Sequence, residues 1–383
     1  MQLVHVATAA VNQTPLAWDE NRANILEAIA QAKDRNVSIL CLPELCITGY
    51  GCEDAFHASG VLRTAAEVLE EIVPHTKGIV VSVGLPRMHG DGIFNTSCLI
   101  SDAKIIGFAA KQNLAGTGVH YEPRWFKAWK SGVCGYTELS GQKYPIGDLL
   151  FDCGGVKIGF EICEDAWTAK RPGRDLARAG ADLLLNPSAS HFAFGKQEIR
   201  KRLVLDGSRA FGVNYLYSNL LGNEAGRMVY DGSTLIASDT KLLAEGKRFS
   251  FEKVQLISAH IDVEASRSRR TQMQEATVAP TVSPEQWVKA DFQFPKTLPA
   301  PTEESGAEWE KSTDIKEEEF TRAVALGLFD YLRKSRSAGF VVSLSGGCDS
   351  SSVATLVTLA VQLGIEELGH ERFIERFSHL ESL

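Results

Sequence analysis

The sequence predicts an α/β (α+β) fold built on β-sheets, and two observations carry that prediction. Short apolar runs of strand character recur through the first 262 residues, and helix-like stretches lie between several of them. Many short strands with interspersed helices in about 260 residues indicate sheets covered by helices. The strand candidates are Leu3–Ala9, Val37–Leu42, Gly78–Leu85, Ser97–Ser101, Val156–Ile162, Asp182–Asn186, Tyr215–Asn219, Ser233–Ala237 and Val254–Ile261.

The helix candidates place apolar residues on one face. In Asp19–Asp34 that face holds Ile25, Leu26, Ile29 and Ala32, at the spacing of an α-helix. Similar patterns occur at Val61–Val73, Lys196–Phe211 and Phe320–Lys334.

The composition excludes several classes of protein. Of 383 residues, 44% are hydrophobic and 23% charged, and the net charge is −8. This is ordinary for a soluble globular protein and lacks the basic surplus of a dedicated nucleic-acid binder. No apolar run approaches the ~18 residues of a transmembrane helix, and the N-terminus has no signal-peptide pattern. With eight cysteines in a chain of this length, we expect reduced thiols in a cytoplasmic protein.

A Pro-rich and acidic stretch divides the chain. Residues 280–301 hold five of the 13 prolines, and residues 301–319 hold eight Asp or Glu and two Lys. Such a stretch has little to bury, which indicates an exposed linker; the alternative is a solvated loop within one domain. We therefore expect a domain at 1–264, a linker at 265–318 and a second domain beginning at 319 and running to 383.

The first chemical candidate is Cys163. A strand pattern runs into it and a charged turn follows, a position from which a nucleophile can project into a cleft. Its neighbours Glu161 and Glu164 tend to raise a thiol pKa, so a reactive Cys163 needs a nearby cation or base. The alternative is a buried cysteine that acts as a small hydrophobic residue.

Two more candidates also follow apolar strands. Glu44 comes after Ile39–Pro43, where partial desolvation would raise its pKa and suit it to accept a proton near neutral pH. Lys111 comes after an apolar run, where a fixed positive charge could stabilise an oxyanion and lower the pKa of a thiol. Taken singly, Glu44 could be an ordinary strand-end residue and Lys111 a solvated surface lysine.

Glu44, Lys111 and Cys163, in this chain order, resemble the Glu-Lys-Cys triad of the nitrilase (carbon–nitrogen hydrolase) superfamily over about residues 1–262. Further motifs look like the glutaminase domain of glutamine-dependent NAD synthetases. These are Gly49–Gly51, Arg124–Phe126, Asn186–His191 and Tyr230–Gly232.

The resemblance implies a four-layer αββα sandwich and a set of roles. Cys163 would attack the side-chain amide of glutamine, Glu44 would transfer protons, and Lys111 with a backbone N–H would hold the oxyanion. Glu122 matches a second carboxylate that supports Lys111. Glutamine would be bound by Glu164, Ser190 and Lys196. No cofactor is implied for this domain.

A second motif lies near the other end of the chain. Gly339–Leu344 predicts an apolar strand, and a Gly-rich turn and an apolar helix follow it. Backbone N–H groups of such a turn, with the helix N-terminus, form an anion site, although this is not a Walker A loop. The alternative is a strand-to-helix turn that simply uses glycines.

The motif resembles the pyrophosphate loop of N-type ATP pyrophosphatases, whose domains are Rossmann-like. That resemblance implies ATP binding, with Asp349 helping to place Mg²⁺. The residues are Leu344, Ser345, Gly346, Gly347, Cys348, Asp349, Ser350 and Ser351.

Together the two motifs imply an ammonia-transferring ligase: deamido-NAD, ATP and glutamine would give NAD, AMP, pyrophosphate and glutamate. The chain extends only 33 residues past Ser350. We therefore expect 319–383 to be an incomplete synthetase domain and the chain to retain only the glutaminase half. We also expect small-molecule substrates, a homo-oligomer, and neither nucleic acid nor membrane as partner. The competing interpretations are a stand-alone nitrilase-family amidase and a binding module without catalysis.

Overall fold

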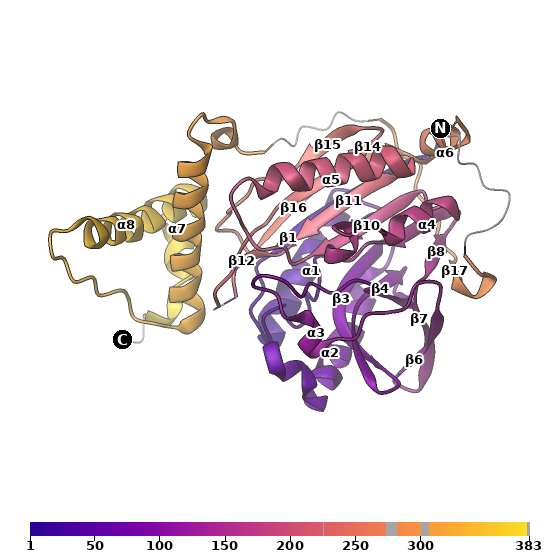
Figure 1. Cartoon of the computed structure of the whole chain (residues 1–383), viewed down its shortest axis with the longest axis horizontal. Helices are drawn as coiled ribbons and strands as arrows, with labels where there is room; N and C mark the ends of the chain where they lie inside the picture. The colour runs from indigo at the N-terminus through magenta and orange to yellow at the C-terminus, as the bar shows by residue number, and fades with distance from the viewer. Residues whose placement is uncertain (225, 273–281, 300–305, 381–383) are drawn as a thin grey trace.

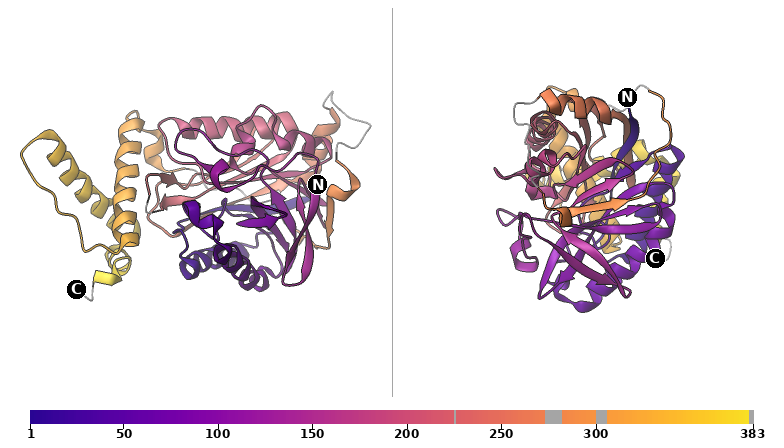
Figure 2. Two further views of the ribbon diagram at one scale, coloured as in Figure 1. Left: turned by 60° about the horizontal axis from the view of Figure 1, so that its bottom comes forward. Right: turned by 90° about the vertical axis from the view of Figure 1, so that its right-hand side faces the viewer.

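Two β-sheets packed face to face form the centre of the molecule, and helices cover the outer face of each (Figures 1 and 2). The structure is a computed structural model, and it describes residues 1–224, 226–272, 282–299 and 306–380. The predicted αββα sandwich is confirmed for the first part of the chain.

The first sheet has eight strands in the order β16-β1-β2-β3-β4-β5-β7-β6. Its central strands β1, β2 and β3 run parallel, whereas β16 pairs antiparallel with β1 at the edge. The strands are β1 Leu3–Val11, β2 Ile39–Cys41, β3 Val80–His89, β4 Gly92–Ser101, β5 Lys104–Ala110, β6 Cys134–Leu139, β7 Gln142–Gly147 and β16 Val254–Asp262.

The second sheet has seven strands in the order β15-β14-β11-β10-β9-β8-β17. Its strands are β8 Leu150–Cys153, β9 Val156–Phe160, β10 Leu183–Ser188, β11 Asn214–Asn219, β14 Thr234–Ser238, β15 Lys241–Glu245 and β17 Trp287–Ala290. A separate pair, β12 Leu221–Asn223 and β13 Val229–Asp231, lies beside the sandwich. Between the two sheets, a layer of buried aliphatic side chains excludes water, among them Val6, Ile39, Val80, Ile158 and Leu216.

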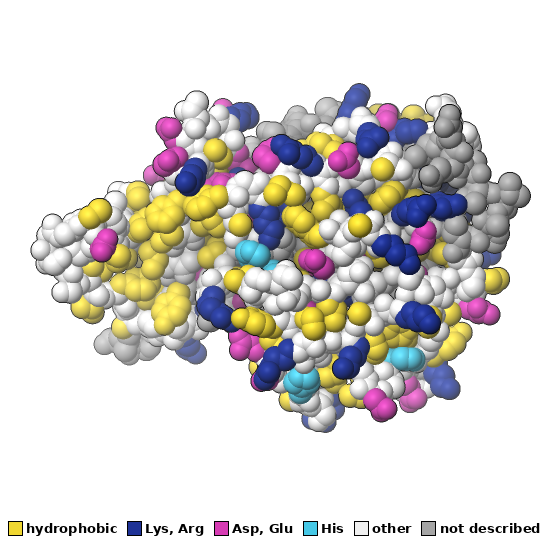
Figure 3. All heavy atoms as spheres, viewed as in Figure 1, with side chains coloured by type: hydrophobic (Ala, Val, Ile, Leu, Met, Phe, Trp, Pro, Cys, Tyr) yellow, Lys and Arg dark blue, Asp and Glu magenta, His cyan; other side chains and the backbone are white. Residues whose placement is uncertain are grey.

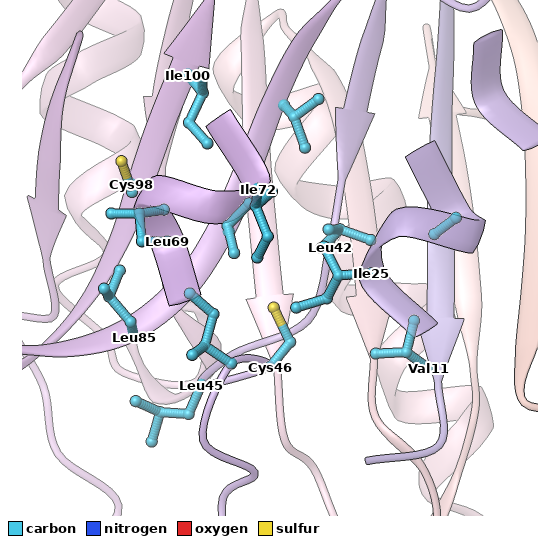
Figure 4. Packing of buried hydrophobic residues seen from close by; sticks show 14 of the residues in the cluster. Val11, Ile25, Leu42, Leu45, Cys46, Leu69, Ile72, Leu85, Cys98 and Ile100 are labelled. Carbon is cyan, nitrogen blue, oxygen red and sulfur yellow. The ribbon is translucent and has the colours of Figure 1, made fainter. Parts of the chain in front are cut away.

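The outer layers follow from helical spacing. Helices α1 (Trp18–Asp34) and α2 (Ser59–Ile72) bury their apolar faces on the first sheet. Figure 4 shows this core close up, including Ile25, Leu42, Leu69, Ile72 and Leu85. Helices α4 (Pro172–Arg178) and α5 (Lys196–Phe211) cover the second sheet in the same way. The short helix α3 (Glu122–Trp125) lies in a long connection after β5.

The stretch predicted as an exposed linker, 265–318, contains regular structure. Helix α6 spans Val263–Gln272, and β17 pairs in parallel with β8 at the edge of the second sheet. Composition missed this strand because four residues pairing at a sheet edge need little apolar surface. The domain boundaries at 264 and 319 stay predictions, and residues 273–281 and 300–305 lie outside the described residues.

The last part of the chain is helical and packs against one end of the sandwich (Figure 1). Helix α7 (Ile315–Ser335) lies next to the sandwich, and α8 (Cys348–Leu368) and α9 (His370–Glu375) follow. A shared apolar cluster joins Phe249 and Phe251 of the sandwich to Leu326 and Phe329 of α7.

Buried polar contacts also hold α7 in place. Asp330 accepts hydrogen bonds from the side chain of Asn12 at 3.0 Å and the backbone N–H of Asn223 at 2.8 Å. Lys334 donates to Asn12 Oδ1 at 2.6 Å and to the carbonyls of Gln13 and Asn223 at 2.8 and 2.7 Å. Because these polar groups are buried, breaking their hydrogen bonds is costly. The network therefore holds α7 against residues 12–13 and 223.

The predicted strand Gly339–Leu344 is wrong. Residues 337–345 form an extended loop, in which Val341 is fully exposed and Leu344 largely so. A strand needs a neighbouring strand to pair with, and the described residues from 306 to 380 contain no β-strand. The Gly-rich turn and the helix after it do form as predicted.

Helix α8 is apolar along most of its length. By length and composition it could cross a membrane, with mean hydropathy 1.3, and only 11% of that window is buried. The count of uninterrupted apolar residues missed it because polar residues interrupt the run. A single such helix is weak evidence of a membrane span. Figure 3 shows apolar side chains gathered over this end of the molecule.

Candidate active site

Glu44 lies in the turn that directly follows β2. The strand is fully buried, and Pro43 ends its hydrogen-bonding pattern, so the chain turns and carries the Glu44 side chain inside with 1% exposure. Glycine at position 84 of β3 makes this turn possible. A Cβ atom there would lie 2.8 Å from the Pro43 carbonyl oxygen and 2.9 Å from the Glu44 carbonyl carbon, closer than such atoms pack.

Lys111, Glu44 and Glu122 form one buried ion-pair network. Nζ of Lys111 lies 2.6 Å from Oε1 of Glu44 and 2.7 Å from Oε1 of Glu122, and all three side chains are buried completely. Lys111 is the first residue after β5, and Glu122 is the first residue of α3. The backbone N–H of Ala115 binds the other oxygen of Glu122 at 2.9 Å. The structure therefore brings together three of the predicted catalytic residues.

Cys163 begins a short 3₁₀ turn, Cys163–Ala166, three residues after β9 ends. Its backbone φ is +48°, in the left-handed region that costs a non-glycine residue roughly 1–2 kcal/mol. Such backbone outliers cluster at active sites, where the surrounding structure holds them in place. Cys163 itself is buried. The thiol interacts electrostatically with Glu44, Lys111 and Glu122, so it joins the same cluster.

The electrostatics of the cluster assign different protonation states to its members. Burial raises the pKa of Glu44 to about 7, although Lys111 opposes the shift. Burial and then Glu44 raise the pKa of the Cys163 thiol to about 12. Burial alone would lower the pKa of Lys111, but Glu122 and Glu44 raise it well above its ordinary value. At neutral pH the thiol is protonated, the lysine is charged, and Glu44 is poised to accept a proton.

Two positioning residues escaped the sequence analysis. Asn95 on β4 donates to Oε1 of Glu44 at 2.7 Å, and the backbone N–H of Ala189 donates to Oε2 at 2.9 Å. Asp165 accepts from the backbone N–H of Ile162 at 3.0 Å and of Asn113 at 2.7 Å. It thereby ties the turn of the nucleophile to the loop after Lys111. Asn95 carried no signal in the sequence, whereas Asp165 stood in the charged turn already singled out.

Glu161 has no direct place in the cluster. It accepts hydrogen bonds from Arg171 Nη2 at 2.5 Å, from the hydroxyl of Tyr215 at 2.6 Å and from the N–H of Gly173 at 3.0 Å. This buried ion pair anchors α4 to the strand that carries Cys163.

The residues predicted to bind glutamine lie around the cluster. Glu164 and Lys196 are half-buried, and each contributes to the pKa of the other. Burial, and after it the charge of Arg200, lower the pKa of Lys196 to about 8. Ser190 is buried and follows β10; its hydroxyl and carbonyl lie 3.2 and 2.9 Å from Nη2 of Arg200.

Arg200 and Asp231 support these predicted glutamine-binding residues, which form the rim of the site; Arg200 was not predicted, and Asp231 was noticed only as part of the Tyr230–Gly232 motif. Arg200 is fully buried and pairs with Asp231, and it also donates to the carbonyl of His191 at 3.0 Å. The hydroxyl of Tyr230, beside Asp231, is buried without a hydrogen-bond partner and interacts electrostatically with Cys163 and Glu44. Tyr230 was noticed only as part of a motif.

The predicted ATP loop lies apart from this site, on the helical end of the chain (Figure 1). The hydroxyl of Ser345 accepts from the N–H of Gly347 at 3.4 Å and contacts the Ser350 hydroxyl at 3.3 Å. Helix α8 starts directly behind the turn, and the loop residues are largely exposed. The role of this turn in ATP binding stays a prediction.

Asp349 offers one exposed carboxylate toward Mg²⁺. Among residues 1–224, 226–272, 282–299 and 306–380, no group of three or more His, Cys, Asp or Glu could hold a metal ion. Mg²⁺ is usually held by one or two carboxylates together with water and substrate phosphates, so the role of Asp349 stays a prediction.

The chain belongs to the carbon–nitrogen hydrolase family, whose profile matches residues 5–271. The NAD synthase family matches residues 320–375. The chain is also similar to the human glutamine-dependent NAD(+) synthetase, with 35% identity over 370 residues. That match covers 92% of this chain and 52% of the human protein.

Solved structures agree. A glutamine-dependent NAD(+) synthetase from Cytophaga hutchinsonii superposes with a TM-score of 0.81 at 43% identity, covering 100% of this chain and 56% of that one. An amidase from Nesterenkonia sp. AN1 matches with a TM-score of 0.55 at 21% identity, covering 70% and 97%. The latter supports the nitrilase-type fold alone. The resemblance seen in the motifs is thus confirmed, and the chain spans about half the length of the curated relatives it matches.

Proposed function

We propose that residues 1–264 hydrolyse the side-chain amide of glutamine and that the ammonia serves an ATP-dependent amidation of deamido-NAD to NAD. The observation that carries the first part is the buried Glu44–Lys111–Glu122 network beside Cys163. The similarity to glutamine-dependent NAD(+) synthetases and the NAD synthase match at 320–375 carry the second.

The chemistry follows from the protonation states. Because the Cys163 thiol is protonated at rest, it needs a base, and Glu44 takes its proton as sulfur attacks the amide carbon. Lys111 and the backbone N–H of Glu164 hold the oxyanion. Glu44 then gives the proton to the leaving nitrogen, which departs as ammonia. Water, deprotonated by Glu44, hydrolyses the thioester and releases glutamate.

Substrate selection is assigned to the rim of the site. The carboxylate of Glu164 would pair with the α-ammonium of glutamine, and Lys196 would pair with its α-carboxylate. Ser190, held by Arg200, would supply a hydrogen bond. Residues 344–351 would bind the phosphates of ATP through backbone N–H groups. A cytoplasmic homo-oligomer is proposed with this function, on the family resemblance.

The test is ammonia release from glutamine by the wild-type chain and by Cys163→Ala. We expect activity in the wild type and loss in the variant; equal rates would overturn the cysteine mechanism. Activity on simple aliphatic amides without activity on glutamine would favour the stand-alone amidase instead. Addition of ATP, Mg²⁺ and deamido-NAD then tests the second part, with NAD formation from glutamine and from ammonium salts compared in both proteins.

A further inference from the structure

We propose that Tyr50, His120 and His191 form a proton relay that connects the buried Glu122–Lys111 pair to the half-exposed rim of the site. The proposal rests on the proposed amide hydrolysis, whichever amide is the substrate. Three hydrogen-bonded contacts in series carry it.

The contacts are continuous. The hydroxyl of Tyr50 donates to Oε1 of Glu122 at 2.8 Å, and its oxygen lies 3.2 Å from Nδ1 of His120. Nε2 of His120 lies 2.9 Å from Nδ1 of His191. Each residue of the series offers an atom that can give a proton and an atom that can take one.

Burial decreases along the series. Glu122 is fully buried and Tyr50 is 3% exposed, whereas His120 and His191 are half-buried. The series therefore starts at the oxygen that binds Lys111 and ends at side chains that reach solvent. The three residues come from three separate segments, since Tyr50 follows the Glu44 turn, His120 precedes α3 and His191 follows β10.

The reaction gives this path a task. Hydrolysis of a primary amide by one water molecule yields a carboxylate, one ammonia and one proton. If the nitrogen leaves as neutral ammonia, fit to act as a nucleophile, the proton must leave the buried site separately. The surplus proton arises when the thioester is hydrolysed, because the thiol proton has already departed with the nitrogen.

The proton count balances along the path. Glu44 takes one proton from the attacking water and passes one to Lys111, while Lys111 passes one to Glu122 across contacts of 2.6 and 2.7 Å. The other proton of that water moves from the new carboxyl group to the Cys163 sulfur as the thiolate leaves, which restores the resting thiol. Once Glu122 carries the proton it becomes the donor to the Tyr50 oxygen, and the Tyr50 hydroxyl turns from Glu122 to Nδ1 of His120. Glu122 then gives its proton to the Tyr50 oxygen as the Tyr50 hydroxyl gives its own to Nδ1 of His120. His120 releases its Nε2 proton to Nδ1 of His191, and His191 releases one from Nε2 to water.

Burial, more than the surrounding charges, keeps both imidazoles neutral, as this exchange requires. Burial lowers the pKa of His120 to about 4; Glu122 raises it, and Lys196 and Lys111 lower it. Burial lowers the pKa of His191 to about 4, with Lys196, His120 and Arg200 lowering it and Asp231 raising it. At pH 7 each ring therefore carries one N–H and one free nitrogen.

The experiment compares the first turnover with steady turnover in His120→Asn, Tyr50→Phe and the wild-type chain. We expect the initial burst of ammonia to keep its rate in both variants, whereas steady turnover falls 10- to 100-fold. Added imidazole should restore steady turnover at least fivefold in His120→Asn and leave Tyr50→Phe slow. His75→Asn, an exposed histidine on another face, is the matched control and should behave as wild type in every assay.

A burst that slows as much as steady turnover in Tyr50→Phe would overturn the relay, because it would indicate a role in positioning Glu122. The absence of imidazole rescue in a folded His120→Asn would also overturn it. All assays are run with glutamine and with a simple aliphatic amide. Turnover of the aliphatic amide alone would contradict the glutamine assignment, and the same comparisons would still decide the relay.

Discussion

Nζ of Lys111 lies 2.6 Å from Oε1 of Glu44, so the proposed base is hydrogen-bonded to the proposed oxyanion holder before any substrate arrives. The pairing restrains both side chains inside a dry cluster. It also opposes the rise that burial causes in the pKa of Glu44, which brings that value to about 7 instead of higher.

The rate of amide hydrolysis should therefore rise with pH around neutrality. Below pH 7 most Glu44 is protonated and cannot accept the thiol proton, so kcat/KM should increase about tenfold per pH unit and flatten above 7. In Glu44→Gln the rise of kcat/KM with pH should disappear, and the rate should fall at least 10²-fold. A wild-type profile that is flat from pH 5 to 8 would contradict the role of Glu44 as base.

The raised pKa of Glu44 also determines how the stability of the fold changes with pH. Folded Glu44 keeps its proton to about pH 7, whereas unfolded glutamate loses it near its ordinary value, so the folded chain binds more protons between the two. The contribution of Glu44 to the free energy of unfolding is present in full at low pH and is lost as the pH rises through 7. Urea titrations of wild type and Glu44→Gln at pH 5 and 8 measure the difference.

Asn95→Leu should raise the pKa of Glu44, so that kcat/KM reaches its plateau at a higher pH. The amide of Asn95 donates to the ionised form of Glu44, a bond of about 1.5–3 kcal/mol, or roughly one to two pH units. Leucine has a similar shape, and the Asn95 carbonyl oxygen lacks a partner, so the fold should tolerate the change. As a control, the substitution in a Glu44→Gln background should shift nothing.

Gly84→Ala should abolish activity by displacing Glu44. The added methyl group would meet the backbone of Pro43 and Glu44, which has no room to retreat from the buried sheet. We expect at least a 100-fold loss of kcat/KM together with reduced stability. The control is Gly60→Ala in α2, where the nearest atom to the added methyl group would be Nη2 of Arg63 at 3.9 Å, an ordinary contact. A helix former there should raise the free energy of unfolding by about 0.5–1 kcal/mol. Full activity of Gly84→Ala would show that the turn can move.

Glu161→Ala should destabilise the domain without touching the reacting atoms. The substitution leaves the partly buried Arg171 uncompensated and the hydroxyl of Tyr215 short of a partner. Breaking a buried pair in this way costs about 3–5 kcal/mol. Chemical denaturation measures it, and an unchanged midpoint would show that Arg171 finds another partner.

Sequence patterns predicted most of the sandwich and the catalytic candidates, for physical reasons that are visible in the structure. The run before Glu44 and the run before Cys163 are buried strands, so the polar residue at the end of each was conspicuous. Lys196–Phe211 coincides with α5, which begins beside a glycine of positive φ and ends at another. Continuous apolar runs mark strands buried on both faces, and these sheets are of that kind.

Other parts lay beyond sequence reasoning. Asn95 lies on β4 and Glu44 follows β2, with β3 between them in the sheet. Only the strand order and register bring the two side chains together. The strand β17 lies in a stretch whose prolines and charges indicated an exposed linker. Residues 339–344 have the composition of a strand but no neighbour among the described residues. Composition describes what a segment can bury, whereas pairing depends on what lies beside it.

Two adjacent residues, Asn223 and Glu224, contact helix α7 on one side and the segment that carries Tyr50 on the other. The backbone N–H of Asn223 donates to Asp330, and the carbonyl of Asn223 accepts from Lys334. The carboxylate of the next residue, Glu224, accepts from the backbone N–H groups of Tyr50 and Gly51, each at 2.8 Å. Helix α7 and the backbone at Tyr50 therefore share one short segment, residues 223–224, as their support. The helix that leads to the Gly-rich turn and the first tyrosine of the proposed relay rest on neighbouring residues of the same chain segment.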